Sequence, residues 1–511
     1  MLARIWSAAV RGVEGFPVGV ELDLANGLPS FTTVGLPDST VREARDRVVP
    51  AVRNSGFDFP SRRVTVNLAP AQWRKGGTHL DLPIGLGVLT ASGQLPEGDW
   101  SRELCFLGEL ALDGSVRPVS GVLPMAASAR ERGLAGLVVP KANRREAEVT
   151  GITTYGVNSL REAVDLIKGA RPKETTEEEK QTYKRTENGI GQQELADLLD
   201  VRGQALARRA LEIAAAGGHN LLMVGPPGTG KSMLARRLPG ILPPLSSAEA
   251  VEVTKIHSVA GLLPPGAGLM SVRPFRAPHS TASLPALVGG GQWCRPGELS
   301  LAHKGVLFLD ELPEFPRAAL EALRQPLEDR VVTVARIRET VVFPSEILLV
   351  AAMNLCPCGK LGSPKDPCRC PESAVRRYRS RVSGPLLDRL DIHVELAPLP
   401  FNDWAGRGGA APEDSAAVRE RVSRCRSVSA ARNGSAETQN ARLGTRELRR
   451  HCRLDAECMA MLERCVGRGQ LSARGIDRML RVARTIADLA GAESIGPPYL
   501  AEALFYRGIQ C

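Results

Sequence analysis

The chain has 511 residues, which predicts about three domains at roughly 150 residues per domain. Apolar residues make up 43% and charged residues 24%, and this ordinary globular composition excludes collagen-like, low-complexity and wholly disordered proteins. The 66 Lys and Arg outnumber the 56 Asp and Glu, and the resulting charge of +10 favours an anionic partner such as nucleic acid or nucleotide, unless it is only spread over a solvated surface.

The cysteines and the apolar runs indicate the compartment. Of the 11 cysteines, four crowd between residues 356 and 370, which is not typical of a secreted disulfide framework. No apolar run approaches the roughly 18 residues of a membrane helix, and the first residues lack the pattern of a signal peptide. We expect a soluble cytoplasmic protein with no membrane partner.

The first half of the chain reads as a mixed α/β domain followed by a linker. Apolar residues alternate with polar ones at Val18, Val20, Leu22 and Leu24, and again at Val64, Val66 and Leu68, which is typical of half-buried strands. We predict a domain over residues 1–168. Residues 169–189 are highly charged and almost without aliphatic side chains, which predicts a linker that cannot bury a core.

The second half predicts a doubly wound α/β domain over residues 190–400. Apolar runs at 221–224, 306–309 and 347–352 alternate with helical patterns, as buried parallel strands do. A glycine-rich break over 405–412 precedes a helical domain over 413–511. One helix there carries an apolar face, which consists of Ile476, Met479, Leu480, Ala483 and Ile486.

Residues 225–232 read GPPGTGKS and match the G-x-x-x-x-G-K-S phosphate-binding loop, between a strand signal and a helix signal. The predicted ATP-binding residues are Gly225, Pro226, Pro227, Gly228, Thr229, Gly230, Lys231 and Ser232. Backbone N–H groups would face the phosphates, Lys231 would reach the β- and γ-phosphates, and the Ser232 hydroxyl would bind Mg²⁺.

A second catalytic segment follows about 75 residues later, where the apolar run 306–309 ends in two carboxylates. Asp310 can hold the Mg²⁺ shell together with Ser232, and Glu311 can polarise a water towards the γ-phosphate. A strand that ends in Asp-Glu is often only a strand that meets a helix. After a phosphate-binding loop, however, the pair predicts ATP hydrolysis.

Four segments in this order, GPPGTGKS, VLFLDELPEF, AAMNLCPCG and GPLLDRLDIHVEL, resemble AAA+ ATPases of the magnesium-chelatase-like group, and more narrowly the ComM/YifB-type family. The resemblance covers essentially the full length. It implies a Lon-protease-like N-terminal domain, an AAA+ core and a C-terminal helical lid. It also implies a ring, usually a hexamer, that holds ATP between neighbours and DNA in its pore. ComM-type members are helicases that drive branch migration when incoming DNA is integrated in natural transformation, and the resemblance implies the same activity for this chain.

The resemblance assigns roles to three further residues. Asn354 resembles the sensor that positions the attacking water, and Arg389 resembles the arginine finger that a neighbouring subunit inserts. Arg474 more loosely resembles the second-sensor arginine. The structural alternatives are a turn-capping asparagine, an ion pair of Arg389 with Asp388 or Asp391, and an ordinary surface arginine. The Gly203-Gln204 pair weakly resembles the segment beside the adenine.

Cys356, Cys358, Cys368 and Cys370 lie within fifteen residues. Four thiolates could enclose a structural Zn²⁺ and would leave no open catalytic position. The C-x-C spacing is tighter than the common C-x₂-C, so reduced thiols in a turn or redox-active pairs are the alternative.

DNA contacts are predicted at a hairpin over residues 328–345, with Arg336 and Arg338 near its tip. Related motors use a hairpin in this place to hold DNA, and two arginines could follow the phosphate backbone. A solvated hairpin is the alternative. A second basic stretch runs from Arg376 to Arg381 and could instead pair with acidic residues across a subunit interface.

Residues 74–89 and 108–140 resemble the Lon-type peptidase fold, whose active members need a Ser–Lys dyad. The positions of the dyad fall at His79 and near Leu123, and neither residue can replace its counterpart. We therefore expect an assembly or DNA-binding module that is not a peptidase. Surface or turn roles are expected for Lys75 and His79.

Three other functions compete with a DNA motor. A magnesium chelatase motor is one, although those motor subunits lack a Lon-like domain and the chain has no D-x-S-x-S motif. An ATP-driven protein remodeller is the second, and a non-enzymatic scaffold is the third. The intact Lys231, Asp310 and Glu311 argue against the scaffold.

Overall fold

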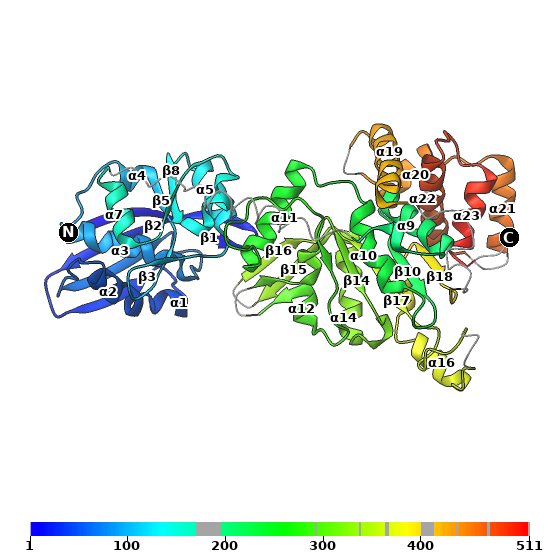
Figure 1. Ribbon diagram of the computed structural model, residues 1–511, viewed down its shortest axis with the longest axis horizontal. Helices are drawn as coiled ribbons and strands as arrows, with labels where there is room; N and C mark the ends of the chain where they lie inside the picture. The colour runs from blue at the N-terminus through cyan, green and yellow to red at the C-terminus, as the bar shows by residue number, and fades with distance from the viewer. Residues whose placement is uncertain are drawn as a thin grey trace. The chain divides into compact units, whose positions relative to one another are not determined.

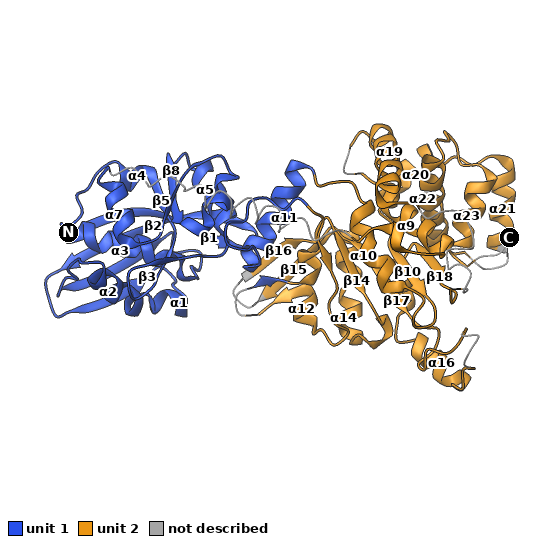
Figure 2. Cartoon of the chain, in the orientation of Figure 1, with its two compact units in different colours: residues 1–193, 246–271, 294–296 blue, residues 194–245, 272–293, 297–511 orange. Residues whose placement is uncertain are grey.

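The computed structural model describes residues 2–169, 196–291, 294–336, 339–362, 367–399, 413–435, 438–467 and 471–508. The predicted linker 169–189 lies outside these ranges, except for Gly169. Two compact units are formed (Figures 1 and 2). Unit 1 comprises residues 1–193, 246–271 and 294–296, and unit 2 comprises 194–245, 272–293 and 297–511. Among the described helices, none is both long and apolar enough to cross a membrane.

Unit 1 is built on a seven-stranded mixed sheet in the order β3-β4-β2-β1-β5-β8-β9. Its strands are β1 (Leu2–Arg11), β2 (Glu14–Ala25), β3 (Ser30–Val34), β4 (Arg63–Ala69), β5 (Leu104–Phe106), β8 (Gly136–Pro140) and β9 (Thr153–Val157), and a small hairpin joins β6 (Glu109–Leu110) to β7 (Val116–Arg117). The predicted alternation is present in β2 and β4, where Val18, Val20, Leu22 and Leu24 face the core.

Helices complete unit 1. They are α1 (Ser39–Arg42), α2 (Ala44–Asn54), α3 (Asp81–Ala91), α4 (Trp100–Glu103), α5 (Val122–Glu131), α6 (Arg144–Glu148), α7 (Leu160–Ile167) and the 3₁₀ turns η1 (Thr78–Leu80) and η2 (Lys141–Asn143). Every residue of α3 is buried, including the polar Asp81 and Thr90, and the helix packs against β1 and β2 within the core.

Helix α11 (Ser247–Ala260) and the short β13 (Arg295–Pro296) lie far along the chain yet belong to unit 1 (Figure 2). α11 packs against α5, and its Ser258 hydroxyl donates a hydrogen bond to the carboxylate of the buried Glu146. The Gly121 N–H donates to the Ser258 carbonyl at 3.0 Å, and the Gly266 N–H donates to the Ala142 carbonyl at 2.7 Å. The sequence ranges given above for the domains stay predictions, and no sequence pattern indicated this discontinuous unit.

Unit 2 contains a five-stranded sheet in which every neighbouring pair is parallel. The order is β11 (Phe275–Arg276), β14 (Val306–Leu309), β17 (Leu348–Met353), β10 (Leu221–Val224) and β18 (Ile392–Glu395). The strands β10, β14 and β17 are the three apolar runs predicted from the sequence. Their full burial explains why the runs are continuous and do not alternate.

Helices and one hairpin surround this sheet. They are η3 (Leu198–Asp200), α9 (Ala205–Gly217), α10 (Lys231–Ile241), α12 (Leu284–Val288), α13 (Glu298–Leu301), η4 (Leu312–Glu314), α14 (Arg317–Ala322), α15 (Arg324–Asp329), α16 (Glu372–Arg379) and α17 (Gly384–Leu387). The short β12 (Gly289–Gly290) follows α12, and the predicted hairpin is present as antiparallel β15 (Val331–Arg336) and β16 (Glu339–Pro344).

The C-terminal part of unit 2 is helical, as predicted. It contains α19 (Ser415–Asn433), η5 (Asn440–Arg442), α20 (Thr445–His451), α21 (Ala456–Gly467), α22 (Ala473–Leu489) and α23 (Pro497–Phe505). Met479, Ala483 and Ile486 of α22 are buried, and they share one core cluster with α9 and the parallel sheet. The predicted fold class is therefore confirmed, with an α/β N-terminal part, a parallel-sheet core and a helical C-terminal region.

Lys75 and His79 do not lie on the surface, so of the expected surface or turn roles only a turn role is compatible with the structure. Lys75 is fully buried, and its ammonium donates hydrogen bonds to the carbonyls of Gly35 and Leu68 at 3.1 Å each and to that of Pro70. Burial lowers the pKa of Lys75 to about 8 and that of His79 to about 4. Lys75 holds the 70–80 loop in place, because three backbone carbonyls replace the water that its buried ammonium would lose.

Candidate nucleotide site

The carboxyl ends of β10, β14 and β17 meet at one edge of the parallel sheet. Val224 pairs in register with Met353, and Leu309 pairs with Ala351. The residues that follow these strands are the phosphate-binding loop from Gly225, then Asp310 and Asn354. Ligands of open parallel sheets bind beyond the carboxyl ends of the strands, so the predicted site residues are gathered where this geometry requires them.

The loop over residues 225–230 has the backbone that a phosphate cradle needs. Gly228 and Gly230 adopt φ of +77° and +91°, a region that side chains disfavour. A Cβ on Gly225 would stand 2.5 Å from the Leu396 carbonyl oxygen, so glycine is also required there for close packing. Helix α10 begins at Lys231, and its first N–H groups therefore face the loop, as in other anion sites.

Lys231 is buried, with 8% of its surface exposed. Its ammonium donates hydrogen bonds to the carbonyls of Gly225 at 2.7 Å and Pro226 at 2.9 Å, and to Asn354 Oδ1 at 3.2 Å. Burial lowers the pKa of Lys231, and the charge of Asp310 opposes this shift. The contact with Asn354 links two residues that are 123 positions apart.

Ser232 and Asp310 form a second contact at the same edge. The Ser232 hydroxyl donates to Asp310 Oδ2 at 2.5 Å, and the Glu311 N–H donates to Asp310 Oδ1 at 2.9 Å. A hydroxyl and a carboxylate in contact supply the hard oxygen ligands that Mg²⁺ prefers. The residues present therefore fit the Mg²⁺ that the sequence predicts.

Glu311 is the exposed residue directly after Asp310. It adopts φ of +52°, in the left-handed region, where it precedes η4. A residue other than glycine rarely adopts this backbone conformation, because it is strained. Backbone strain of this kind is concentrated at functional sites. Sequence reasoning selected the residue and could not have found its backbone conformation.

The structure shows a contact with the phosphate-binding loop for Gln204 and, in the described ranges, none for Arg474. Gln204, with φ of +53°, donates from its amide to the carbonyls of Ala397 at 2.7 Å and Thr229 at 3.3 Å, so it contacts the phosphate-binding loop. Arg474 is exposed in the first turn of α22, and within the described ranges no hydrogen bond or ion pair joins it to that loop. Its predicted role stays a prediction.

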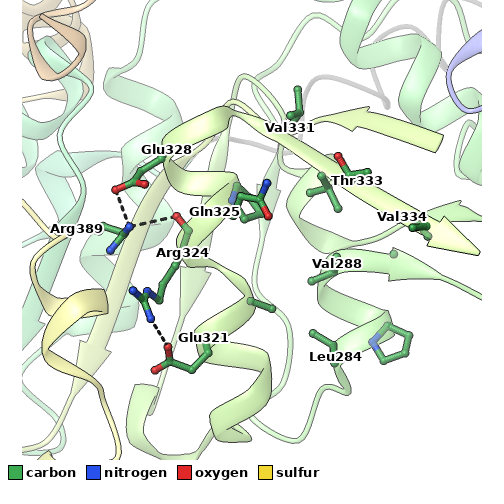
Figure 3. Close-up of a pocket in the computed structure, with 16 residues that line it drawn as sticks. Leu284, Val288, Glu321, Arg324, Gln325, Glu328, Val331, Thr333, Val334 and Arg389 are labelled. Atoms are coloured by element: carbon green, nitrogen blue, oxygen red, sulfur yellow. Dashed lines mark hydrogen bonds and ion pairs between the residues drawn. The ribbon is translucent and has the colours of Figure 1, made fainter. Parts of the chain in front are cut away.

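Arg389 is held by three contacts within its own chain. Its guanidinium donates to the Arg324 carbonyl at 3.1 Å, the Pro385 carbonyl at 2.6 Å and Glu328 Oε1 at 2.6 Å. The ion-pair partner is thus Glu328, and neither Asp388 nor Asp391 has that role. Figure 3 shows the contacts of Arg389 with Glu328 and the Arg324 carbonyl at one side of a cavity of about 710 Å³, opposite Leu284, Val288 and Val334.

The predicted DNA residues are only partly described. Arg336 ends β15 and pairs in register with Glu339, whereas Arg338 lies outside the described ranges. Arg381 of the second basic stretch donates to Glu314 at 2.7 Å, so this arginine has a partner within the same chain.

The four predicted zinc ligands come together. Their sulfur atoms all lie within 4.8 Å of one another, and those of Cys356, Cys358 and Cys368 are separated by 3.4, 3.5 and 3.7 Å. A tetrahedral site with Zn–S bonds of about 2.3 Å has sulfur–sulfur edges of about 3.8 Å. Backbone N–H groups of Leu361 and Cys370 also donate to two of the sulfurs. The geometry therefore fits a Zn²⁺ site, and these cysteines are free thiols in the structure.

The segment around Gly359, next to Cys358, contacts the phosphate-binding loop. The sequence analysis did not predict this contact. A Cβ on Gly359 would stand 2.8 Å from Pro227 Cγ, so the two loops are in close contact there. The Arg379 guanidinium donates to the Leu355 carbonyl at 3.2 Å, and this bond ties α16 to the segment after Asn354. Only the short distance from Asn354 to Cys356 along the chain could have suggested this arrangement.

Three family models match the chain. "Magnesium chelatase, subunit ChlI" matches residues 197–403, "Subunit ChlI of Mg-chelatase" matches residues 20–143, and "Magnesium chelatase, subunit ChlI C-terminal" matches residues 412–507. The matches therefore cover both halves of the chain.

Similar proteins extend this result. Competence protein ComM of Haemophilus influenzae is 44% identical over 511 residues, which cover 99% of this chain and 98% of that protein. YifB of Escherichia coli (strain K12) is 42% identical over 509 residues, at 99% and 97% coverage. Lon protease 2 of Bacillus subtilis (strain 168) is 22% identical over 149 residues, or 28% of this chain and 26% of that protein. Because the similarity to ComM and YifB is high over nearly the whole length, the chain belongs to the ComM/YifB family of magnesium-chelatase-like AAA+ proteins.

Proposed function

We propose that the chain is an ATPase that moves DNA, as a translocase or helicase that promotes branch migration during natural transformation. The observation that carries the ATPase activity is the contact of Lys231 with Asn354 and of Ser232 with Asp310 at one sheet edge. DNA as the partner is supported by the net charge of +10, by the β15–β16 hairpin and by the printed name of the Haemophilus relative.

Different residues of the chain would have different roles in ATP hydrolysis. Ser232 and Asp310 would hold Mg²⁺, which supplies neutralisation of phosphate charge. Lys231 would exchange its two backbone carbonyl partners for phosphate oxygens, a charge-assisted contact stronger than the one it leaves. Glu311 would accept a proton from the attacking water, and the Asn354 amide would orient that water.

A ring of subunits, most simply a hexamer, would complete each site. Arg389 would approach the nucleotide of the neighbouring subunit, where a permanently charged guanidinium stabilises the transition state. It would first have to leave Glu328 and the carbonyls of Arg324 and Pro385. Arg474 would contact the nucleotide from the lid, and Zn²⁺ on the four cysteines would brace the loop after Asn354.

The test is ATP turnover with and without single-stranded, duplex and four-way-junction DNA. We expect DNA to stimulate turnover, most strongly with branched DNA. The Glu311→Gln variant serves as the blank, because it should bind nucleotide and lose turnover by roughly 10²-fold or more. Turnover that no form of DNA changes would contradict the DNA motor.

The matched family descriptions favour one second candidate, a magnesium-chelatase motor subunit. Turnover that responds to a chelatase partner and is indifferent to DNA would support it. A protein remodeller would respond to polypeptide, and its binding would lack the steep salt dependence of phosphate contacts.

A further inference from the structure

Helix α20 lies in the C-terminal helical part of unit 2 (Figure 1) and carries exposed arginines. Leu448 and Cys452 are 3% and 6% exposed and belong to the core cluster, so they form the inner side of this segment. Arg446, Arg449 and Arg450 are exposed, and Arg453 is exposed just after the helix ends. Residues three and four positions apart share a helix face, so the first three guanidinium groups project from one side.

This face is not neutralised by acidic side chains. Across the described ranges, none of the four arginines makes a hydrogen bond or an ion pair. Other arginines of the same bundle are paired: Arg424 contacts Glu420 at 3.0 Å, and Arg432 contacts Asp488 at 2.6 Å. The carboxylate of α20 is Glu447, and it lies beside Gly444 at the start of the helix.

Unpaired like charges on one turn of helix repel each other and lower its stability. An anionic partner would offset this repulsion. We propose that the α20 face, comprising Arg446, Arg449, Arg450 and Arg453, binds the phosphate backbone of duplex DNA. This inference rests on the proposed DNA function and adds a second contact surface, separate from the hairpin.

The residue types on the α20 face indicate which kind of partner it binds. It exposes no aromatic ring on which a base could stack, as single-stranded DNA sites require. Its apolar residues are turned into the bundle, so it has no apolar anchor for a membrane surface or a protein. Guanidinium groups alone recognise phosphates, and a duplex presents its phosphates outward with the bases inside.

The test is the binding of the full-length protein to a labelled duplex between about 50 and 200 mM salt. Each phosphate contact adds about 0.9 to the slope of log affinity against log salt. The R446Q/R449Q/R450Q variant should therefore reduce the slope by about 2 to 3 and weaken binding at low salt at least roughly tenfold. Its ATP turnover without DNA should equal that of the unaltered protein, which verifies folding.

Single variants test the contribution of one arginine at a time to the salt dependence of DNA binding. R449Q should reduce the slope by about 0.9, whereas R424Q, an exposed arginine already paired with Glu420, should leave it unchanged. R449K should restore the slope, since lysine keeps the phosphate contact.

The outcomes separate this inference from the proposed function. If the unaltered protein shows no salt-dependent binding to duplex, the α20 inference is wrong, and the proposed function is wrong as well if single-stranded and four-way-junction DNA also leave ATP turnover unchanged. If it binds and the triple variant keeps the same slope and affinity, only the α20 inference is wrong. A loss confined to single-stranded DNA would also overturn it.

Discussion

Single residues of the nucleotide site have separable tasks. Lys231 and Asn354 are in contact, but a positive charge is needed to bind phosphate, whereas an amide is needed only to orient water. Removal of each should therefore produce a different kinetic defect.

We expect Asn354→Ala to keep nucleotide affinity within a fewfold and to lower turnover by roughly 10²-fold, the usual loss for one positioned polar group. Lys231→Ala should weaken nucleotide binding as well as turnover. Titration with a fluorescent ATP analogue, together with the steady-state rate, separates the two cases. Asn158→Ala, in unit 1, is the control. Turnover of Asn354→Ala at the unaltered rate would show that this residue only caps a turn.

The cysteine cluster permits a measurement that does not depend on activity. The purified protein should contain about one zinc per chain, and Cys358→Ser or Cys368→Ser should lose it. Cys425→Ala, which removes a buried thiol outside the cluster, should retain it. Elemental analysis is the measurement, and a metal-free protein with intact thiols would leave reduced thiols as the correct interpretation.

The sequence predicted best those site residues that lie within or directly after a recognisable motif or apolar strand. The GPPGTGKS segment and the Asp310–Glu311 pair follow strands that are readable as apolar runs, so their meeting at a sheet edge was predictable. The surroundings of Lys75 and Arg389 were not predictable, because they come from residues up to 65 positions away that no local pattern brings together.

At the scale of elements, Glu346 joins three segments of unit 2. It lies between β16 and β17 and contacts Lys304 at 2.9 Å, before β14, and Arg442 at 2.6 Å, in η5. Burial raises the pKa of Glu346, but hydrogen bonds and charge from Arg442 and Lys304 outweigh it, and the pKa falls to about 2. This carboxylate therefore stabilises the fold only while it is ionised.

The pH dependence follows from that shift. Since the pKa is lower in the folded state, the stabilisation is complete above the ordinary value of 4.5 and is lost as the pH falls towards 2. It amounts to about 3 kcal/mol at neutral pH. Glu346→Gln should therefore lower the thermal midpoint at about pH 7, and the difference from the unaltered protein should shrink below about pH 4.5. The exposed Glu420→Gln should show no such trend. A difference that stays constant with pH would contradict the ion-pair role.

At the scale of the whole molecule, the three intrachain contacts of Arg389 bear on assembly. If a ring places this arginine in a neighbour's site, the defects of two variants should compensate. Lys231→Ala lacks nucleotide binding and keeps the finger, whereas Arg389→Ala has the opposite defect. Mixed in equal amounts, they should regain turnover well above the sum of the separate rates. Lys231→Ala mixed with Glu311→Gln, which leaves no intact hydrolytic site, is the control. No gain on mixing would place the action of Arg389 within its own chain.

The order of parts along the chain stays a prediction, since the glycine-rich break over 405–412 and all of the charge run over 169–189 except Gly169 lie outside the described residues. The packing of the parts depends on contacts that no local pattern in the sequence shows. The membership of residues 246–271 in unit 1 depends on the burial of Glu146 against Ser258, two side chains that are 112 positions apart.

The packing of α11 on α5 limits how the protein can be shortened. A fragment that ends at residue 193 would leave Glu146 without the Ser258 hydroxyl and would uncover the surface of α5 that α11 occupies. A fragment that begins at residue 196 would carry α11 without the α5 surface against which it packs. We expect both fragments to aggregate, as size-exclusion chromatography would show, and the first to be rescued by a covalently attached 246–271 segment. A protease that cuts between residues 170 and 195 would thus leave the two pieces held together.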